Sequence, residues 1–167
     1  TTIVQSLRNF ARLDEAELLS VDLTEGIDSA LTLLDHRLKD RIVVTREYGE
    51  LPHVLCYASQ MNQAFMNLLT NAIEAIDGTG EITVITRIEP PHAVVEVSDT
   101  GSGIPPEKLD HIFDPGSTTK GVGVGVGVGL SITYRIVQDH QGSIEVCSRL
   151  GEGTTFTIRI PTDRRPQ

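Results

Sequence analysis

Hydrophobic residues recur along the chain with two periods, one typical of helices and the other typical of strands. Between residues 59 and 76 the apolar positions are three or four apart, at Met61, Phe65, Leu68, Leu69, Ala72 and Ile76. This spacing gathers them on one face and predicts the strongest helix of the chain. Weaker helical spacing predicts further helices over 3–19, 24–38 and 130–140. Thr24 is the expected N-cap of the second of these.

Alternation of apolar and polar residues, rich in β-branched side chains, predicts strands over 41–48, 54–57, 81–88, 92–98, 142–148 and 154–160. Helices interspersed with these strands predict helices on one face of a mixed sheet, an α+β fold of the two-layer α/β sandwich type. Gly, Pro, Thr and Ser dominate residues 99–129. A loop of that length inside a compact domain is usually functional.

Length, composition and net charge limit the class of protein that this chain can be. The 167 residues suffice for one domain, and 39% of them are hydrophobic, which favours a globular fold. The net charge of -9 argues against a nucleic-acid partner, whose phosphates require clustered cations. Cys56 and Cys147 lack metal-ligand spacing, so we expect two buried, reduced thiols. No apolar run approaches the ~20 residues of a membrane span and no signal peptide opens the chain, so we expect a cytoplasmic domain.

Two asparagines stand on the strongest predicted helix. Asn67 and Asn71 are four residues apart and therefore share a face, with Glu74 nearby. Asparagine has poor helix propensity, so its presence beside an apolar stripe needs a reason. One possibility is that the amides bond neighbouring backbone. The other is that a side-chain oxygen is a ligand of Mg²⁺, which takes one or two protein oxygens and completes its shell with water and phosphate.

Two glycine-containing segments are candidate ligand loops. Asp99 ends a predicted strand and could accept a hydrogen bond from an exocyclic amine such as that of adenine, although an ordinary Asp-Gly turn is the alternative. Gly101 and Gly103 permit a close backbone approach or positive φ. Glycines alternate with valines over 121–129 and lead into a predicted helix, where free amides and the helix dipole favour an anion. A flexible low-complexity linker is the alternative there.

The order of the motifs is more specific than any one of them. The chain carries in succession the segments 67–72, 99–104, 112–115, 118–120, 127–131 and 151–156. Together they resemble the N, G1, F and G2 boxes and the closing Gly-Thr segment of sensor histidine kinases in the GHKL ATPase superfamily. The resemblance extends over 21–161. It implies a Bergerat-type sandwich that binds ATP and Mg²⁺ beneath a lid.

The resemblance also implies a role for each matching residue. Asn71 matches the Mg²⁺-ligating asparagine and Asn67 the polar position one turn before it, while Glu74 is a candidate general base or metal-tuning group. Asp99 and Thr154 match the adenine-reading pair. The expected catalytic residues are Asn67, Asn71, Glu74 and Lys120. The expected nucleotide-binding residues are Asn71, Asp99, Gly101, Gly103, Ile104, Thr118, Thr119, Lys120, Gly127, Gly129, Leu130 and Thr154.

The rest of the chain fits the same resemblance. Residues 1–20 resemble the end of a helical dimerisation and phosphotransfer domain, 21–161 the catalytic domain and 162–167 a tail. None of the five histidines has the context of a phosphoacceptor, so the acceptor histidine is expected on a separate helical domain and a response regulator downstream. The isolated piece is expected to be monomeric.

Two features depart from the family pattern. Gly116-Ser117 stands where a bulky aromatic is common, and the Gly-Val alternation replaces the usual Gly-Thr-Gly-Leu-Gly-Leu. Nucleotide binding should persist, because the backbone donors remain, but lid closure and catalytic efficiency are in doubt. The alternatives are a nucleotide-binding regulatory module of the same fold without kinase output, and a related GHKL ATPase.

Overall fold

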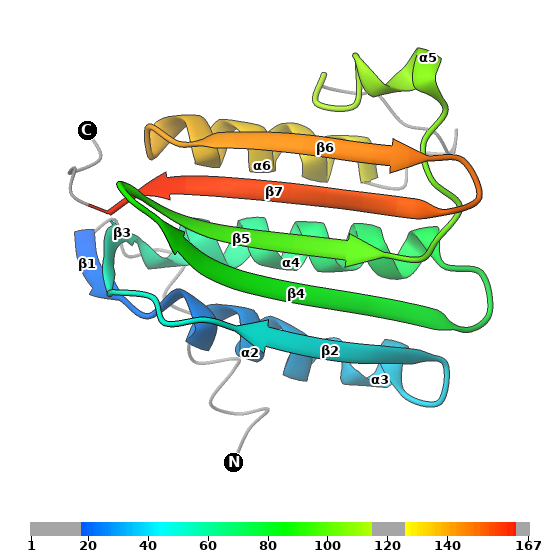
Figure 1. Cartoon of the computed structure of the whole chain (residues 1–167), viewed down its shortest axis with the longest axis horizontal. Helices are drawn as coiled ribbons and strands as arrows, with labels where there is room; N and C mark the ends of the chain where they lie inside the picture. The colour runs from blue at the N-terminus through cyan, green and yellow to red at the C-terminus, as the bar shows by residue number, and fades with distance from the viewer. Residues whose placement is uncertain (1–17, 115–125, 163–167) are drawn as a thin grey trace.

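In the computed structural model, residues 18–114 and 126–162 are described, and the statements below concern these residues. The elements are labelled in Figure 1. Their order is β1 (Leu18–Val21), α2 (Leu23–Leu33), α3 (Asp35–Leu38), β2 (Ile42–Tyr48), β3 (Val54–Tyr57), α4 (Ala58–Ala75), β4 (Gly80–Glu89), β5 (His92–Asp99), α5 (Pro106–Leu109), α6 (Val126–Asp139), β6 (Ser143–Arg149) and β7 (Gly153–Pro161).

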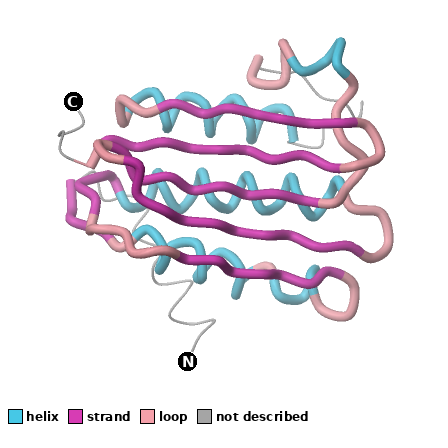
Figure 2. Tube along the Cα trace, viewed as in Figure 1, coloured by secondary structure: helices cyan, strands magenta, loops and turns pink. Residues whose placement is uncertain are grey.

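The strands form one large sheet and one small one. The large sheet has the order β2-β4-β5-β7-β6, in which β2 runs parallel to β4 and the other neighbours are antiparallel. The small sheet consists of β1 and β3, which pair antiparallel. Helices α2, α4 and α6 lie side by side behind the large sheet (Figures 1 and 2). The predicted two-layer α+β architecture with a mixed sheet is therefore confirmed.

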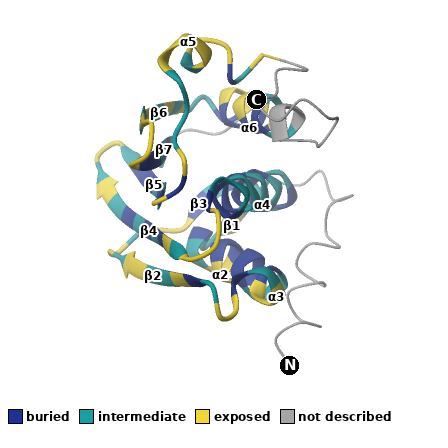
Figure 3. Ribbon diagram, turned by 90° about the vertical axis from the view of Figure 1, so that its right-hand side faces the viewer, coloured by how far each residue is buried: buried dark blue, intermediate teal, exposed yellow. Residues whose placement is uncertain are grey.

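The buried residues lie between these two layers (Figure 3). The apolar stripe of α4 is fully buried, with Phe65, Leu68 and Leu69 at 0–1% exposure. Strand β4 alternates buried and accessible positions, so that Ile82 and Val84 face the helices. The apolar positions that recur along the sequence thus form the face of each element that is buried in the core.

Helix α2 begins and ends differently from the prediction. Asp22, and not Thr24, is the N-cap, because the Asp22 side chain accepts the Thr24 amide at 3.0 Å. The carboxylate also accepts the Thr24 hydroxyl at 2.6 Å. The predicted helix over 24–38 is interrupted at Leu34 and continues as the short helix α3.

Three other predictions change near the ends of the described segments. Most of the helix predicted over 3–19 lies outside the described residues, but Leu18 and Leu19 belong to strand β1 and not to a helix. Helix α6 begins at Val126, four residues before its predicted start. The predicted loop contains the short helix α5.

The two cysteines differ. Burial raises the pKa of the Cys56 thiol to about 12, as expected of an inert buried thiol. Cys147 is exposed on strand β6, so the prediction that both thiols are buried is wrong for this residue. None of the helices within 18–114 and 126–162 is both long and apolar enough to cross a membrane.

His140 at the end of α6 is a structural residue. Its ring is 2% exposed, and its Nδ1–H donates to the Ile136 carbonyl at 2.8 Å. Nε2 accepts the backbone N–H of Tyr57 at 3.1 Å, which ties α6 to the junction of β3 and α4. Burial lowers the pKa of His140, so the fold favours the neutral ring that this arrangement requires.

Candidate functional site

Helix α4 carries polar residues on the side that meets α6. The Asn67 Nδ2 donates to the Gly129 carbonyl at 3.1 Å and to the Thr133 hydroxyl at 3.2 Å. Its Oδ1 accepts the Gln63 side-chain amide at 2.8 Å. Both ends of the Asn67 carboxamide are therefore bonded: Nδ2 joins α4 to α6, and Oδ1 is held within α4. The bond to the Gly129 backbone agrees with one of the two sequence interpretations.

Asn71, one turn later, differs from Asn67. Its side chain is half-buried, and no hydrogen bond joins it to any other described residue. An amide in that condition keeps its oxygen available as a ligand for a hard cation. Of the two predicted asparagines, Asn71 therefore fits a metal-binding role and Asn67 fits a role in holding α6.

Glu74 lies one turn beyond Asn71 and faces α3. A carboxylate oxygen of Glu74 lies 3.6 Å from Arg37 Nη2, and the Glu74 side chain is 19% exposed. The neighbouring Arg41 donates to the Ile76 carbonyl at 2.7 Å, just past the last turn of α4. Arg37 thus contacts the last turn of α4 and Arg41 the residue after it, near the negative end of the helix dipole.

Asp99 is the last residue of β5 and is buried, with 5% exposure. Its Oδ1 accepts the Gly101 amide at 2.8 Å. Burial raises the pKa of Asp99, while hydrogen bonds from the Gly101 and Thr154 backbone oppose that rise. Thr154 is the residue opposite Asp99 on β7, so the sheet brings together the two residues that the sequence placed at the adenine contact.

Backbone segments approach one another closely around Asp99. A Cβ atom on Gly101 would lie 2.4 Å from the Ala75 carbonyl oxygen, and one on Gly103 would lie 2.1 Å from that of Arg149. Gly103 also has φ +77°. The Ser102 amide donates to the Ala75 carbonyl at 2.9 Å, which joins the Asp99 loop directly to the last turn of α4. Asn71 and Asp99 therefore lie at the same end of the molecule.

Ser148 is a member of this site that sequence reasoning missed. Its hydroxyl oxygen accepts the Ile104 amide at 2.8 Å and lies 2.8 Å from the Thr154 hydroxyl. It also donates to the Gly153 carbonyl at 3.1 Å. Ser148 thus links the loop after β5 to strand β7. No sequence signal singled it out, because a serine in an alternating strand is ordinary.

The first turn of α6 faces α4. Because the helix begins at Val126, the amides without an intrahelical partner are those of its first turn, Gly127 among them. Gly129 contributes its carbonyl to Asn67 and to Thr133. Leu130 is buried at 5% exposure and packs in the core. Thr118, Thr119 and Lys120 lie outside the described residues.

Phe113 packs beside this helix. Its ring centroid lies 5.4 Å from that of Tyr134 on α6 and 6.3 Å from that of Phe156 on β7. The segment before the undescribed stretch is therefore fixed against α6 and the sheet by aromatic contacts.

Comparisons with known proteins agree with this geometry. Residues 56–164 match the family described as "Histidine kinase-, DNA gyrase B-, and HSP90-like ATPase". The sensor histidine kinase ZraS of Escherichia coli K12 is 33% identical over 163 residues, which are 96% of this chain and 35% of ZraS. Sporulation kinase C of Bacillus subtilis is 34% identical over 142 residues, 83% of this chain and 33% of that protein. The chain spans about a third of the length of these relatives.

Solved structures give the same result. The nucleotide-free catalytic domain of histidine kinase ThkA superposes with a TM-score of 0.79 at 31% identity, covering 87% of this chain and 96% of that domain. The mycobacterial sensor histidine kinase MprB superposes with a TM-score of 0.77 at 29% identity, covering 90% and 99%. The chain belongs to the histidine kinase-, DNA gyrase B- and HSP90-like ATPase family, within which its fold is that of a histidine kinase catalytic domain.

Proposed function

We propose that this chain is the catalytic domain of a two-component sensor histidine kinase. It binds ATP with Mg²⁺ and transfers the γ-phosphate to a histidine on a separate helical domain, from which a response regulator is phosphorylated. The single observation that supports this most is that two residues lie at the same end of α4: Asn71, whose amide makes no hydrogen bond with a described residue, and the buried carboxylate of Asp99. The parent protein would present this domain to cytoplasmic ATP.

Each residue would contribute by position. Asp99 would accept the adenine amino group, and Thr154 with Ser148 would hold the strand end that carries it. Asn71 would hold Mg²⁺, which would neutralise phosphate oxygens when bound. The first-turn amides of α6, together with Lys120, Thr118 and Thr119, would face the phosphates. Transfer of a phosphoryl group asks mainly for positioning and charge stabilisation, which such an arrangement would supply.

The two asparagines offer a matched test of this assignment. Asn71→Ala should leave the free energy of unfolding within about 0.5 kcal/mol of wild type, because no described residue loses a hydrogen bond. It should nevertheless abolish the Mg²⁺-dependent part of ATP affinity in a calorimetric titration. Asn67→Ala should show the opposite pattern. It should lose about 1–2 kcal/mol of stability, because three hydrogen bonds are broken, and should keep the Mg²⁺-dependent part of ATP affinity.

Two results would contradict the proposal. One is Mg²⁺-dependent ATP binding by Asn71→Ala equal to wild type. The other is the absence of any preference for ATP over GTP, since the Asp99 contact would select the C6 amino group of adenine, where guanine has a carbonyl oxygen. ATP binding without phosphorylation of a supplied histidine domain would instead favour the regulatory module, and ATP hydrolysis by the domain alone would favour the related ATPase.

A further inference from the structure

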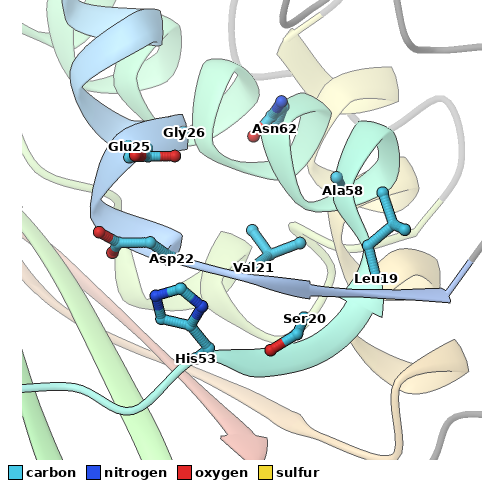
Figure 4. Close-up of a pocket in the computed structure, with 9 residues that line it drawn as sticks. All are labelled: Leu19, Ser20, Val21, Asp22, Glu25, Gly26, His53, Ala58 and Asn62. Atoms are coloured by element: carbon cyan, nitrogen blue, oxygen red, sulfur yellow. The ribbon is translucent and has the colours of Figure 1, made fainter.

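A cavity of about 160 Å³ lies at the opposite end of α4 from Asp99. Figure 4 shows it between strand β1, the first turn of α2 and the first turns of α4. The polar residues of its lining are Ser20, Asp22, Glu25, His53 and Asn62. Asn62 and Ala75 are about 20 Å apart along the helix, so this cavity is separate from the site proposed above.

Asn62 is the unusual member of the lining. It is 6% exposed, and its side chain makes no hydrogen bond with any described residue. Its oxygen and nitrogen are not among the fully enclosed side-chain atoms that lack a partner, so the carboxamide opens onto the cavity. The fold makes room for it, because a Cβ atom on Gly26 would lie 2.2 Å from Asn62 Oδ1. The oxygen lies on the side of the carboxamide that faces Gly26 and Glu25 (Figure 4).

The charge of the cavity is negative and has no matching cation within the described residues. Asp22 uses one oxygen to cap α2, and Glu25 is an exposed carboxylate of the same first turn. Neither carboxylate forms an ion pair with a described residue. Capping and the helix dipole explain why acidic residues stand here. They do not explain a buried amide that opens onto the same space without a partner.

We propose that this cavity binds a guanidinium group, presented as an arginine side chain of a partner polypeptide. A guanidinium has donors in a planar fork that matches carboxylate oxygens, and its remaining N–H groups suit a neutral amide oxygen. An ammonium is a more strongly hydrated point charge and gains less from three separate acceptors. Asp22, Glu25 and Asn62 all line the cavity and supply carboxylate and amide oxygens for such a group.

The test is a titration of the ¹⁵N-labelled chain followed by NMR, with N-acetyl-arginine amide as the probe. We expect saturable shifts of the Asn62 side-chain NH₂ and the Gly26 amide. The neutral isostere N-acetyl-citrulline amide should bind at least tenfold more weakly, because it lacks the positive charge that strengthens hydrogen bonds to carboxylates. N-acetyl-lysine amide should also bind more weakly.

Two variants complete the experiment. Glu25→Gln removes one charge from an exposed position and should weaken arginine binding about tenfold, while the matched control Glu47→Gln on β2 should not change it. Asn62→Ala should weaken binding as well. Shifts that do not saturate, equal shifts with citrulline, or unchanged binding by Glu25→Gln would overturn the proposal and leave water as the occupant. Free guanidinium chloride binding as tightly as the arginine derivative would overturn the polypeptide source.

This result is independent of the proposed kinase function. Glu25→Gln should keep the ATP affinity of the wild-type chain, because Glu25 is on α2 and lines the cavity at the far end of α4 from Asp99. A failure of arginine binding with intact ATP binding would therefore count against the cavity alone. Loss of ATP binding in the unchanged chain would count against the nucleotide site alone.

Discussion

The two ends of helix α4 are held in different ways. At the carboxyl end, backbone meets backbone: the loop after Asp99 approaches the last turn so closely that Gly101 admits no Cβ atom. The same loop lies equally close to the end of β6, where Gly103 meets the Arg149 carbonyl. At the amino end, side chains make the joints, as His140 accepts the Tyr57 amide and Asn62 fills the space over Gly26. The backbone contacts leave no space for a methyl group at the carboxyl end, whereas the side-chain contacts at the amino end border a cavity of about 160 Å³.

The largest effect that would test this comparison comes from two glycines with the same backbone conformation. Gly103 and Gly151 have φ +77° and +78°, but only Gly103 lies against a backbone carbonyl. Gly151→Ala should cost about 1–2 kcal/mol of stability through the left-handed conformation alone. Gly103→Ala should cost about 1–3 kcal/mol more, because the new methyl group meets the Arg149 carbonyl oxygen.

Urea unfolding of both variants measures the difference between their losses of stability. The slopes of the two transitions should be equal, which shows that both variants unfold in the same two-state manner. Equal losses for the two variants would show that the close approach at the carboxyl end is not a constraint. The matched φ values make the second variant a control for conformational strain.

At the amino end of α4, we expect an effect of intermediate size from His140, on how the free energy of unfolding depends on pH. The fold lowers the pKa of His140 below its ordinary value of 6.5, so the unfolded chain binds a proton first as the pH falls. Stability should therefore be constant with respect to this group above about pH 6.5, fall below that value, and level off beneath the folded-state pKa. His140→Leu should remove this dependence and cost about 1–3 kcal/mol at neutral pH, since the Tyr57 amide loses its acceptor.

Unfolding free energies measured across pH 5–8 give both quantities. His36, whose ring is exposed on α3, is the matched control, and His36→Leu should retain the pH dependence of the wild-type chain. A wild-type slope that survives in His140→Leu would contradict the assignment of the proton to His140.

The smallest expected effect is a gain in stability on substitution of Gly129. Gly129 lies inside α6, and a Cβ atom there would make only an ordinary contact, 3.5 Å from the Asn67 side chain. Gly129→Ala should raise stability by about 0.5–1 kcal/mol, because alanine has the better helix propensity and restricts the unfolded chain. A loss of stability in thermal unfolding would show that α6 meets α4 as closely as the loop after Asp99 does.

Local pattern gave much of the fold. The stripe at Phe65, Leu68 and Leu69 predicted the central helix within a residue at each end, and alternation found every strand of the large sheet. The predictions failed where two local signals competed. Thr24 and Asp22 are both good caps, and only the realised turn decides between them. The glycines before Leu130 argue against a helix, yet contact with α4 allows one from Val126.

The sequence by itself determined the elements, the fold class and the family, because periodicity and motif order are properties of neighbouring residues. Only the tertiary structure separated Asn67, which bonds Gly129 and Thr133 on a distant segment, from Asn71, which makes no hydrogen bond with a described residue. Ser148 and the cavity beside Asn62 likewise emerged only from the folded chain. Such contacts depend on which distant segments the packed core brings together, and a local pattern of residues does not contain that information.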